Sequence, residues 1–175
     1  MNIWHDTPKE NVKKDVFDAF IEIPKGCKVK YELDKATVLL RVDRILYTST
    51  VYPCNYGLIP RTLADDNDPL DVLVLCSEQI TSGAVVRCVP IGVIKMVDGA
   101  AMDEKVVAVP VGDPYYKHYG DINGLPKHVF DEMMHFFAVY KALENKTTFV
   151  ENIYGKEEAM EIVGKCMAAY ECKFE

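Results

Sequence analysis

Apolar and polar positions alternate along the first two-thirds of the chain. Residues 17–23 place four apolar side chains on one face of an extended segment, and residues 29–33 place three on one face of the next. Further apolar runs, separated by Gly, Pro or Asp, occupy residues 37–42, 72–76, 84–89, 91–97 and 105–111. A period of two predicts β-strands, and this succession of short runs is typical of an antiparallel sheet or a small barrel.

The last third of the chain changes to a helical period. Residues 126–144 carry apolar side chains three and four positions apart, and Pro126 falls in the first turn, where proline is tolerated. A second helix is predicted over residues 156–170. We therefore expect a mainly β protein with two α-helices, in which a small closed five-stranded OB-like barrel carries extra strands and two covering helices.

Size and composition limit the classes of function. The 175 residues suit one domain, residues 1–175, because only residues 98–102 and 112–124 read as longer loops and neither resembles a linker. A net charge of -7 argues against a nucleic-acid partner. No signal peptide and no run of roughly 18 apolar residues is evident, so we expect no membrane partner and a cytoplasmic location. The six scattered cysteines are expected to be reduced thiols.

Four aspartates within seven residues are the strongest chemical signal: Asp65, Asp66, Asp68 and Asp71. Carboxylates this close repel one another by about 1 kcal/mol per pair in water and about 4 kcal/mol at a protein surface. A divalent cation would neutralise them. Oxygen ligands without Cys or His favour Mg²⁺, Mn²⁺ or Ca²⁺ over zinc.

The spacing of the aspartates allows them to converge. Asp66 and Asp68 point to one side of an extended segment, and Pro69 bends the chain so that Asp71 can rejoin them. A solvated acidic turn is the alternative interpretation. An EF-hand calcium loop is excluded, because Asp71 stands where that loop requires glycine and Ser77 stands where it requires glutamate.

Two earlier segments supply further candidates. Glu22, Lys30 and Glu32 project from the polar faces of the first two strands, where a solvated outer face is the alternative. Tyr52 and Tyr56 lie about ten residues before the aspartates. They could offer hydroxyls to an oxyanion or a water, or they could simply pack near a turn.

These segments resemble one known family. Residues 66–72, Asp-Asn-Asp-Pro-Leu-Asp-Val, match the DxDPxDV signature of soluble family I inorganic pyrophosphatases, and residues 52–57, Tyr-Pro-Cys-Asn-Tyr-Gly, resemble the segment that precedes it. Further matches in family order and spacing occur at residues 21–24, 30–32, 42–44, 92–96, 103, 105, 135–137 and 140–141. The short chain is similar to the prokaryotic branch of this family.

The resemblance implies a role for each matching position. The implied metal ligands are Asp66, Asp71 and Asp103, with Asp98 sharing a further ion with Asp103, and Glu22 and Glu32 acting largely through water. Asp68 is the implied general base, with Tyr56 beside it. The implied phosphate-binding residues are Lys30, Arg44, Lys105, Tyr140 and Lys141, with Tyr52 lining the same cavity.

The implied reaction is Mg²⁺-dependent hydrolysis of pyrophosphate to two orthophosphates by a metal-activated water. Several Mg²⁺ ions serve each site, and Mn²⁺ is a possible substitute. Gly99, directly after Asp98, departs from the resemblance, which leads us to expect a second acidic residue there in many relatives. The departure bears on the affinity or geometry of the outer metal ion that arrives with the substrate, and not on the reaction class. Another two-metal phosphohydrolase is the alternative, although no P-loop pattern occurs, and an OB-like binding module is disfavoured by the acidic charge.

Assembly is also implied by the resemblance. Short relatives form homohexamers, built as dimers of trimers. His135, on the first predicted helix, lies either at a subunit contact or on a helix surface or in the core.

Overall fold

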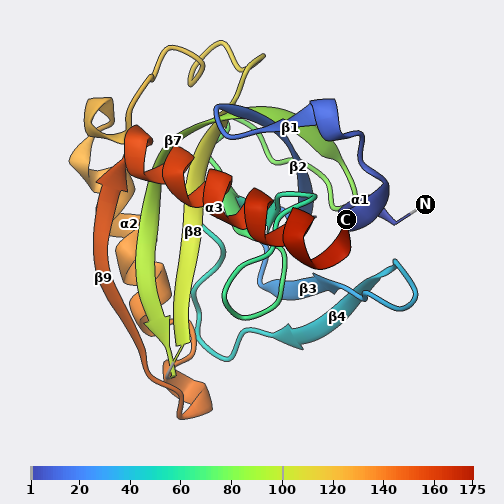
Figure 1. Ribbon diagram of the computed structural model, residues 1–175. Helices are drawn as coiled ribbons and strands as arrows, with labels where there is room; N and C mark the ends of the chain where they lie inside the picture. The colour runs from blue at the N-terminus through green and yellow to red at the C-terminus, as the bar shows by residue number, and fades with distance from the viewer. Residues whose placement is uncertain (1, 100) are drawn as a thin grey trace.

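Five strands are hydrogen-bonded to one another in a closed ring. The computed structural model describes residues 2–99 and 101–175 (Figure 1). Neighbouring strands in the ring are β2 (Val16–Ile23), β5 (Asn55–Leu58), β6 (Asp71–Val74), β8 (Ala101–Pro110) and β7 (Val85–Asp98). β7 also pairs with β2, so the hydrogen-bonded pairings form a ring. The β6–β8 pairing is parallel and the other ring pairings are antiparallel, which differs from the all-antiparallel sheet that alternation suggested.

The remaining elements surround this ring. β1 (Val12–Lys13) and β9 (Thr148–Gly155) extend the sheet, and β3 (Val29–Leu33) and β4 (Leu40–Ile45) form a separate two-stranded sheet. The helices are α1 (Ile3–Asp6), α2 (Lys127–Val139) and α3 (Lys156–Phe174). Short 3-10 helices are η1 (Lys9–Asn11), η2 (Ile122–Gly124) and η3 (Ala142–Glu144). The protein is thus mainly β, with the two predicted longer helices and one short helix that was not predicted.

Two hydrophobic clusters explain why the ring strands are apolar on both faces. Leu73, Ile94 and Val107 pack with residues of α2, whereas their neighbours on the opposite face of each strand pack under α3. In Figure 1, α3 crosses one face of β7 and β8, and α2 lies behind the sheet. Within the described residues, no helix is both long enough and apolar enough to cross a membrane.

Two strands differ from the prediction in their boundaries. The runs at 84–89 and 91–97 are one strand, β7, which continues through a register shift between Pro90 and Gly92. Proline has no N–H to donate to the ladder, and a bulge accommodates it. β4 begins at Leu40 because Val38 adopts a left-handed conformation with φ 60° in the preceding turn.

The predicted loop at 98–102 is a tight connection between β7 and β8, whose ends pair at Asp98 and Ala101. Residue 100, which falls in that loop, lies outside the described residues. The predicted loop at 112–124 contains only the short η2 at its end.

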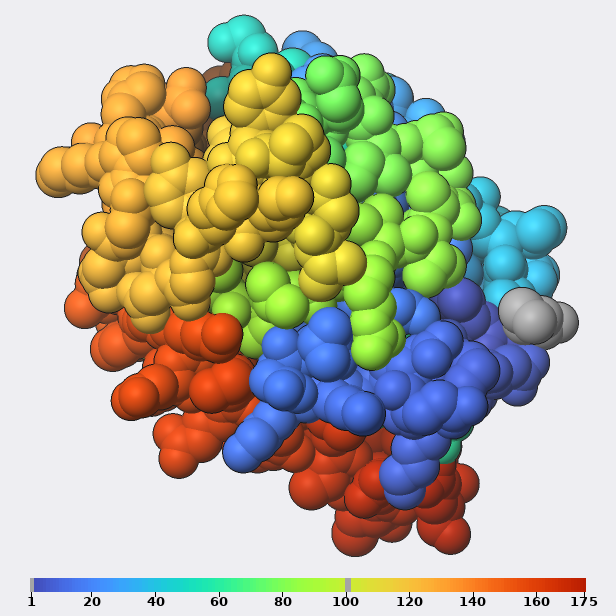
Figure 2. All heavy atoms as spheres, turned by 90° about the horizontal axis from the view of Figure 1, so that it is seen from above, coloured from blue at the N-terminus to red at the C-terminus, as the bar shows by residue number. Residues whose placement is uncertain are grey.

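The two ends of the chain meet. Trp4, buried in α1, packs with Leu63 and with Tyr170 of α3. Figure 2 shows the blue N-terminal segment lying against the red C-terminal helix. Lys9 adds an ion pair of 2.6 Å with Glu171.

Candidate active site

One cavity of about 380 Å³ collects nearly all of the predicted site residues. It opens between the ring strands, the β3–β4 sheet and the end of α2. The predicted residues that line it are Glu22, Lys30, Glu32, Tyr52, Tyr56, Asp66, Asp68, Asp71, Asp98, Asp103, Lys105, Tyr140 and Lys141. Arg44 is the predicted site residue that does not line it.

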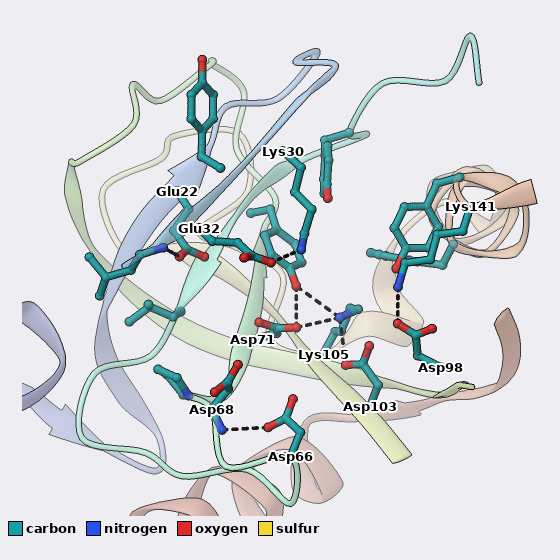
Figure 3. Close-up of a pocket in the computed structure, with 18 of the residues that line it drawn as sticks. Glu22, Lys30, Glu32, Asp66, Asp68, Asp71, Asp98, Asp103, Lys105 and Lys141 are labelled. Atoms are coloured by element: carbon teal, nitrogen blue, oxygen red, sulfur yellow. Dashed lines mark hydrogen bonds and ion pairs between the residues drawn. The ribbon is translucent and has the colours of Figure 1, made fainter. Parts of the chain in front are cut away.

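Lys105 lies at the centre of the cavity. The parallel register of β6 and β8 sets Asp71 opposite Lys105, and Asp103 precedes Lys105 by two positions on the same strand face. The Lys105 Nζ donates to Asp71 Oδ2 at 2.7 Å and to Asp103 Oδ1 at 2.8 Å. Figure 3 shows these three side chains meeting between Asp66 and Asp68 on one side and Asp98 and Lys141 on the other.

Opposed effects act on the ammonium group of Lys105. Burial by itself lowers its pKa, but the neighbouring Asp71 and Asp103 carboxylates raise the pKa well above its ordinary value. Lys105 therefore stays protonated and, with only 3% of its side chain exposed, holds a positive charge against two carboxylates.

Tyr56 belongs to the same network. Its hydroxyl donates to Asp71, and Lys105 Nζ donates to the Tyr56 oxygen at 3.2 Å. Burial first, and then the Asp71 charge, raise the pKa of Tyr56 well above its ordinary value, so the phenol is a donor and not a base. The expected neighbour of Tyr56 was Asp68, whereas its hydrogen bond goes to Asp71.

The loop before β6 turns Asp66 and Asp68 toward the cavity. Ala64 N donates to Asp68 O at 2.8 Å, Asp68 N donates to Asp66 Oδ1 at 2.9 Å, and Asn67 adopts a left-handed φ of 70°. Burial, followed by the Asp103 charge, raises the pKa of Asp66. Removal from water disfavours the charged form of a carboxyl group, and a neighbouring negative charge adds to this effect.

Asp65, the fourth aspartate, points elsewhere. It is exposed, lies outside the cavity and pairs with Lys165 of α3 at 3.4 Å.

Glu22 decides between the two interpretations of the early strands. It is buried, with 7% of its surface exposed, and its Oε1 accepts a hydrogen bond of 2.7 Å from Leu33 N. Burial raises its pKa to about 8, with smaller contributions from Asp71 and Glu32. A solvated outer face is therefore wrong for Glu22. Glu32 is more exposed and forms an ion pair with Lys30 at the edge of the cavity.

Aromatic side chains form the other wall. Tyr52 is buried, with its ring 4.7 Å from that of Phe136 and 5.4 Å from that of Tyr56. Tyr140, directly after α2, is also buried. Burial raises the pKa of both phenols, so both remain hydrogen-bond donors. Lys141 forms an ion pair with Asp98, which closes this side of the cavity.

Arg44 lies on β4, outside the lining of the cavity. Its Nε donates to Glu144 Oε1 at 3.0 Å and its Nη1 donates to Asp43 Oδ2 at 2.5 Å. Its Nη2 is buried and has no hydrogen-bond partner among the described residues. Arg44 is thus charged and held close to the site without reaching its surface in this conformation.

Sequence reasoning missed Lys35 and Glu144. Lys35 lines the cavity and forms an ion pair with Asp68, and Glu144 binds Arg44. Lys35 lies in the turn between β3 and β4, and Glu144 ends η3; both are outside the matched segments. Nothing in their local sequence marks them, since each reaches its partner only through tertiary structure.

The donor set fits a hard divalent cation. Seven carboxyl groups and four lysines line the cavity, and the candidate ligands are all oxygen atoms. Even with Glu22 protonated, the carboxylates outnumber the lysines, which leaves an excess of negative charge. In the part of the chain that the structure describes, no three His, Cys, Asp or Glu side chains are already grouped as a ready-made metal site. Lysines instead pair with Asp71, Asp98 and Asp103.

Comparison with known proteins gives a consistent result. The family model for inorganic pyrophosphatase matches residues 19–171. Soluble inorganic pyrophosphatase 1 of Arabidopsis thaliana is 48% identical over 95% of this chain and 79% of its own length. Soluble inorganic pyrophosphatase 2 of Chlamydomonas reinhardtii is 47% identical over 96% of this chain and 88% of its own.

Solved structures agree with the sequence comparisons. The inorganic pyrophosphatase of Helicobacter pylori superposes with a TM-score of 0.88, at 42% identity over 91% of this chain and 95% of its own. That of Thermus thermophilus gives 0.90 at 35% identity, covering 98% of this chain and 99% of its own. The fold, the content of the cavity and these similarities together confirm the predicted resemblance, and the chain belongs to the inorganic pyrophosphatase family.

Proposed function

We propose that this inorganic diphosphatase hydrolyses pyrophosphate to two orthophosphates in the acidic cavity, with Mg²⁺ as its cofactor. The observation that carries the proposal is the convergence of Asp66, Asp68, Asp71 and Asp103 around the buried Lys105. These residues come from a loop and two strands, so their meeting is a property of the fold. Such a group of carboxylates suits a polyanionic substrate only when cations accompany it.

The metal-binding residues that we propose are Asp66, Asp71, Asp98 and Asp103, with Glu22 and Glu32 contributing through water. Several Mg²⁺ ions, or Mn²⁺ in their place, would supply charge neutralisation and a water of lowered pKa. Asp71 would hold a metal ion at the centre of the cavity, where it contacts Tyr56 and Lys105.

Side chains of the protein would supply the general base and the groups that bind phosphate. We assign Asp68 as the general base that accepts a proton from the attacking water, because its carboxylate is half-exposed and lines the cavity. Lys30, Lys105 and Lys141 would stabilise the phosphate oxygens with charge-assisted hydrogen bonds. Tyr52 and Tyr140, held as neutral phenols, would donate hydrogen bonds. Arg44 would contribute once its guanidinium turns from Glu144 toward the substrate.

Phosphate release tests this function directly. The protein is assayed with pyrophosphate, ATP and a phosphomonoester, each with Mg²⁺ and each with excess chelator. We expect release from pyrophosphate that disappears with chelator and returns with Mg²⁺. Hydrolysis that persists after thorough metal removal would contradict the cofactor assignment. A preference for ATP or the phosphomonoester would instead favour a different phosphohydrolase.

The proposal also covers the barrel, the assembly and the cellular location of the protein. The five-stranded ring is proposed to be the small OB-like barrel expected from the sequence, because its strands bury side chains on both faces. A homohexamer built from two trimers is proposed for the assembly. His135 is exposed on α2 and available for a contact between subunits. Light scattering measures the mass of the assembly. A cytoplasmic location accords with six unpaired cysteines.

A further inference from the structure

Lys35 lies at the tip of the β3–β4 hairpin, in a turn with a defined shape. The carboxylate of Asp34 accepts hydrogen bonds from Ala36 N at 3.0 Å and Thr37 N at 2.9 Å, and pairs with Arg41 at 2.7 Å. This arrangement is a capped turn, in which a side chain satisfies backbone donors. These hydrogen bonds therefore fix the backbone of the turn that carries Lys35.

The ammonium group of Lys35 lies near the N-terminal aromatic cluster. Its Nζ lies 5.6 Å from the centroid of the Trp4 ring, within the range of a cation–π interaction. The indole itself is anchored, because it is buried and its Nε1 donates to the Thr62 carbonyl at 2.8 Å. Figure 1 shows the β3–β4 connection on the same side of the molecule as α1.

The ammonium group of Lys35 forms an ion pair with Asp68. Backbone hydrogen bonds fix the loop that carries Asp68, but they involve its N–H and carbonyl and not its carboxylate. Among the described residues, Lys35 is the only side chain that binds the Asp68 carboxylate. The carboxylate is half-exposed, so without Lys35 its rotamer would be free to vary.

We propose that Lys35 is a positioning residue for Asp68: braced against Trp4, it holds the carboxylate of the general base toward the attacking water. The inference rests on the proposed function. It concerns orientation, because a base contributes only when it lies within hydrogen-bond reach of the proton that it removes. A loosely held carboxylate would spend most of its time in unproductive rotamers.

The same loop provides a matched control. Lys165 pairs with Asp65, three positions before Asp68, at the surface outside the cavity. Both pairs join a lysine to an aspartate of one loop, and only the Lys35 pair faces the site. Replacing Lys165 removes an equivalent surface charge without touching the proposed base.

The test compares Lys35→Ala, Lys35→Arg and Lys165→Ala by kcat and KM for pyrophosphate with saturating Mg²⁺. We expect Lys35→Ala to lower kcat by about tenfold, the scale of a modest misplacement of a catalytic group. KM should change by about twofold or less, because the loss falls on the transition state. Lys35→Arg should restore most of the activity, and Lys165→Ala should match the wild type. A rise in KM alone would overturn the proposal and make Lys35 a substrate-binding residue.

A double-mutant cycle separates positioning from a general structural effect. Lys35→Ala is introduced into Asp68→Asn, and all variants are checked by thermal unfolding. If Lys35 acts through Asp68, its replacement has little further effect once the carboxylate is gone. An undiminished additional tenfold loss would overturn the proposal. Wild-type protein without pyrophosphatase activity would instead contradict the proposed function, so the two failures are distinguishable.

Discussion

The four clustered aspartates are chemically identical but differ in their surroundings. Asp68 lines the cavity with a half-exposed carboxylate, whereas Asp65 lies outside it beside Lys165. We expect Asp68→Asn to lower kcat by about 10²-fold or more, because an amide cannot accept the proton of the attacking water. Asp65→Asn is the matched control and should retain normal turnover. Steady-state kinetics measures both, and near-normal turnover of Asp68→Asn would move the role of base to another group.

Glu22 gives a residue-scale prediction about pH and stability. Its pKa is about 8 in the fold, against 4.5 when unfolded. Below pH 4.5 the carboxyl is neutral in both states. Between pH 4.5 and 8 the unfolded chain releases this proton while the fold retains it, so the contribution to stability falls as pH rises. Each unit of pKa difference corresponds to about 1.4 kcal/mol.

Glu22→Gln should therefore stabilise the metal-free protein, more at pH 8 than at pH 5, by up to a few kcal/mol. The amide oxygen can still accept the hydrogen bond from Leu33 N. Urea unfolding in the presence of chelator measures the effect. An equal effect at both pH values would show that Glu22 is already ionised in the fold.

At the scale of elements, the pairing of β2 with β5 depends on Gly57. A Cβ at this position would lie 1.9 Å from the carbonyl oxygen of Phe20, which belongs to the backbone and cannot move aside. We expect Gly57→Ala to destabilise the protein by several kcal/mol or to prevent folding. Gly164→Ala in α3 is the control, since nothing lies within 4 Å of its Cβ and alanine favours a helix by up to about 1 kcal/mol. Thermal unfolding of both should show opposite shifts, and a tolerated Gly57→Ala would mean that β2 and β5 are spaced differently.

Some helices and strands could be predicted from the sequence alone, and others could not. Strong alternation located β2 and β3, and helical spacing located α2 and α3. β5 was missed because its four residues include Gly57 and carry no clear alternation, and β7 was divided because Pro90 reads as a strand end.

In the site, Asp66, Asp68 and Asp71 are marked by one local motif. The ion pairs of Lys35 with Asp68 and of Arg44 with Glu144 depend on how segments distant in sequence pack together, which no local pattern encodes.

At the scale of the whole molecule, the fold gathers an excess of negative charge in one cavity. Seven carboxyl groups, of which Glu22 is protonated below about pH 8, face four lysines in the cavity, within a chain whose net charge is already -7. Repulsion of this kind destabilises the folded state relative to the unfolded chain. Cations that bind only the folded protein relieve the repulsion and shift the folding equilibrium by mass action. Stability and activity should therefore depend on the same ions.

Mg²⁺ should consequently raise the unfolding temperature even without substrate. At a concentration 100 times its Kd, one bound ion contributes about 2.7 kcal/mol, which for a domain of this size corresponds to about 5 to 10 °C. Thermal scans with MgCl₂, compared with NaCl at equal ionic strength, separate specific binding from screening. Asp65→Asn should keep the full shift. Asp103→Asn should lose most of it, because the replaced carboxylate lines the cavity beside Lys105. Equal shifts in the two variants would place the stabilising ion elsewhere on the acidic surface.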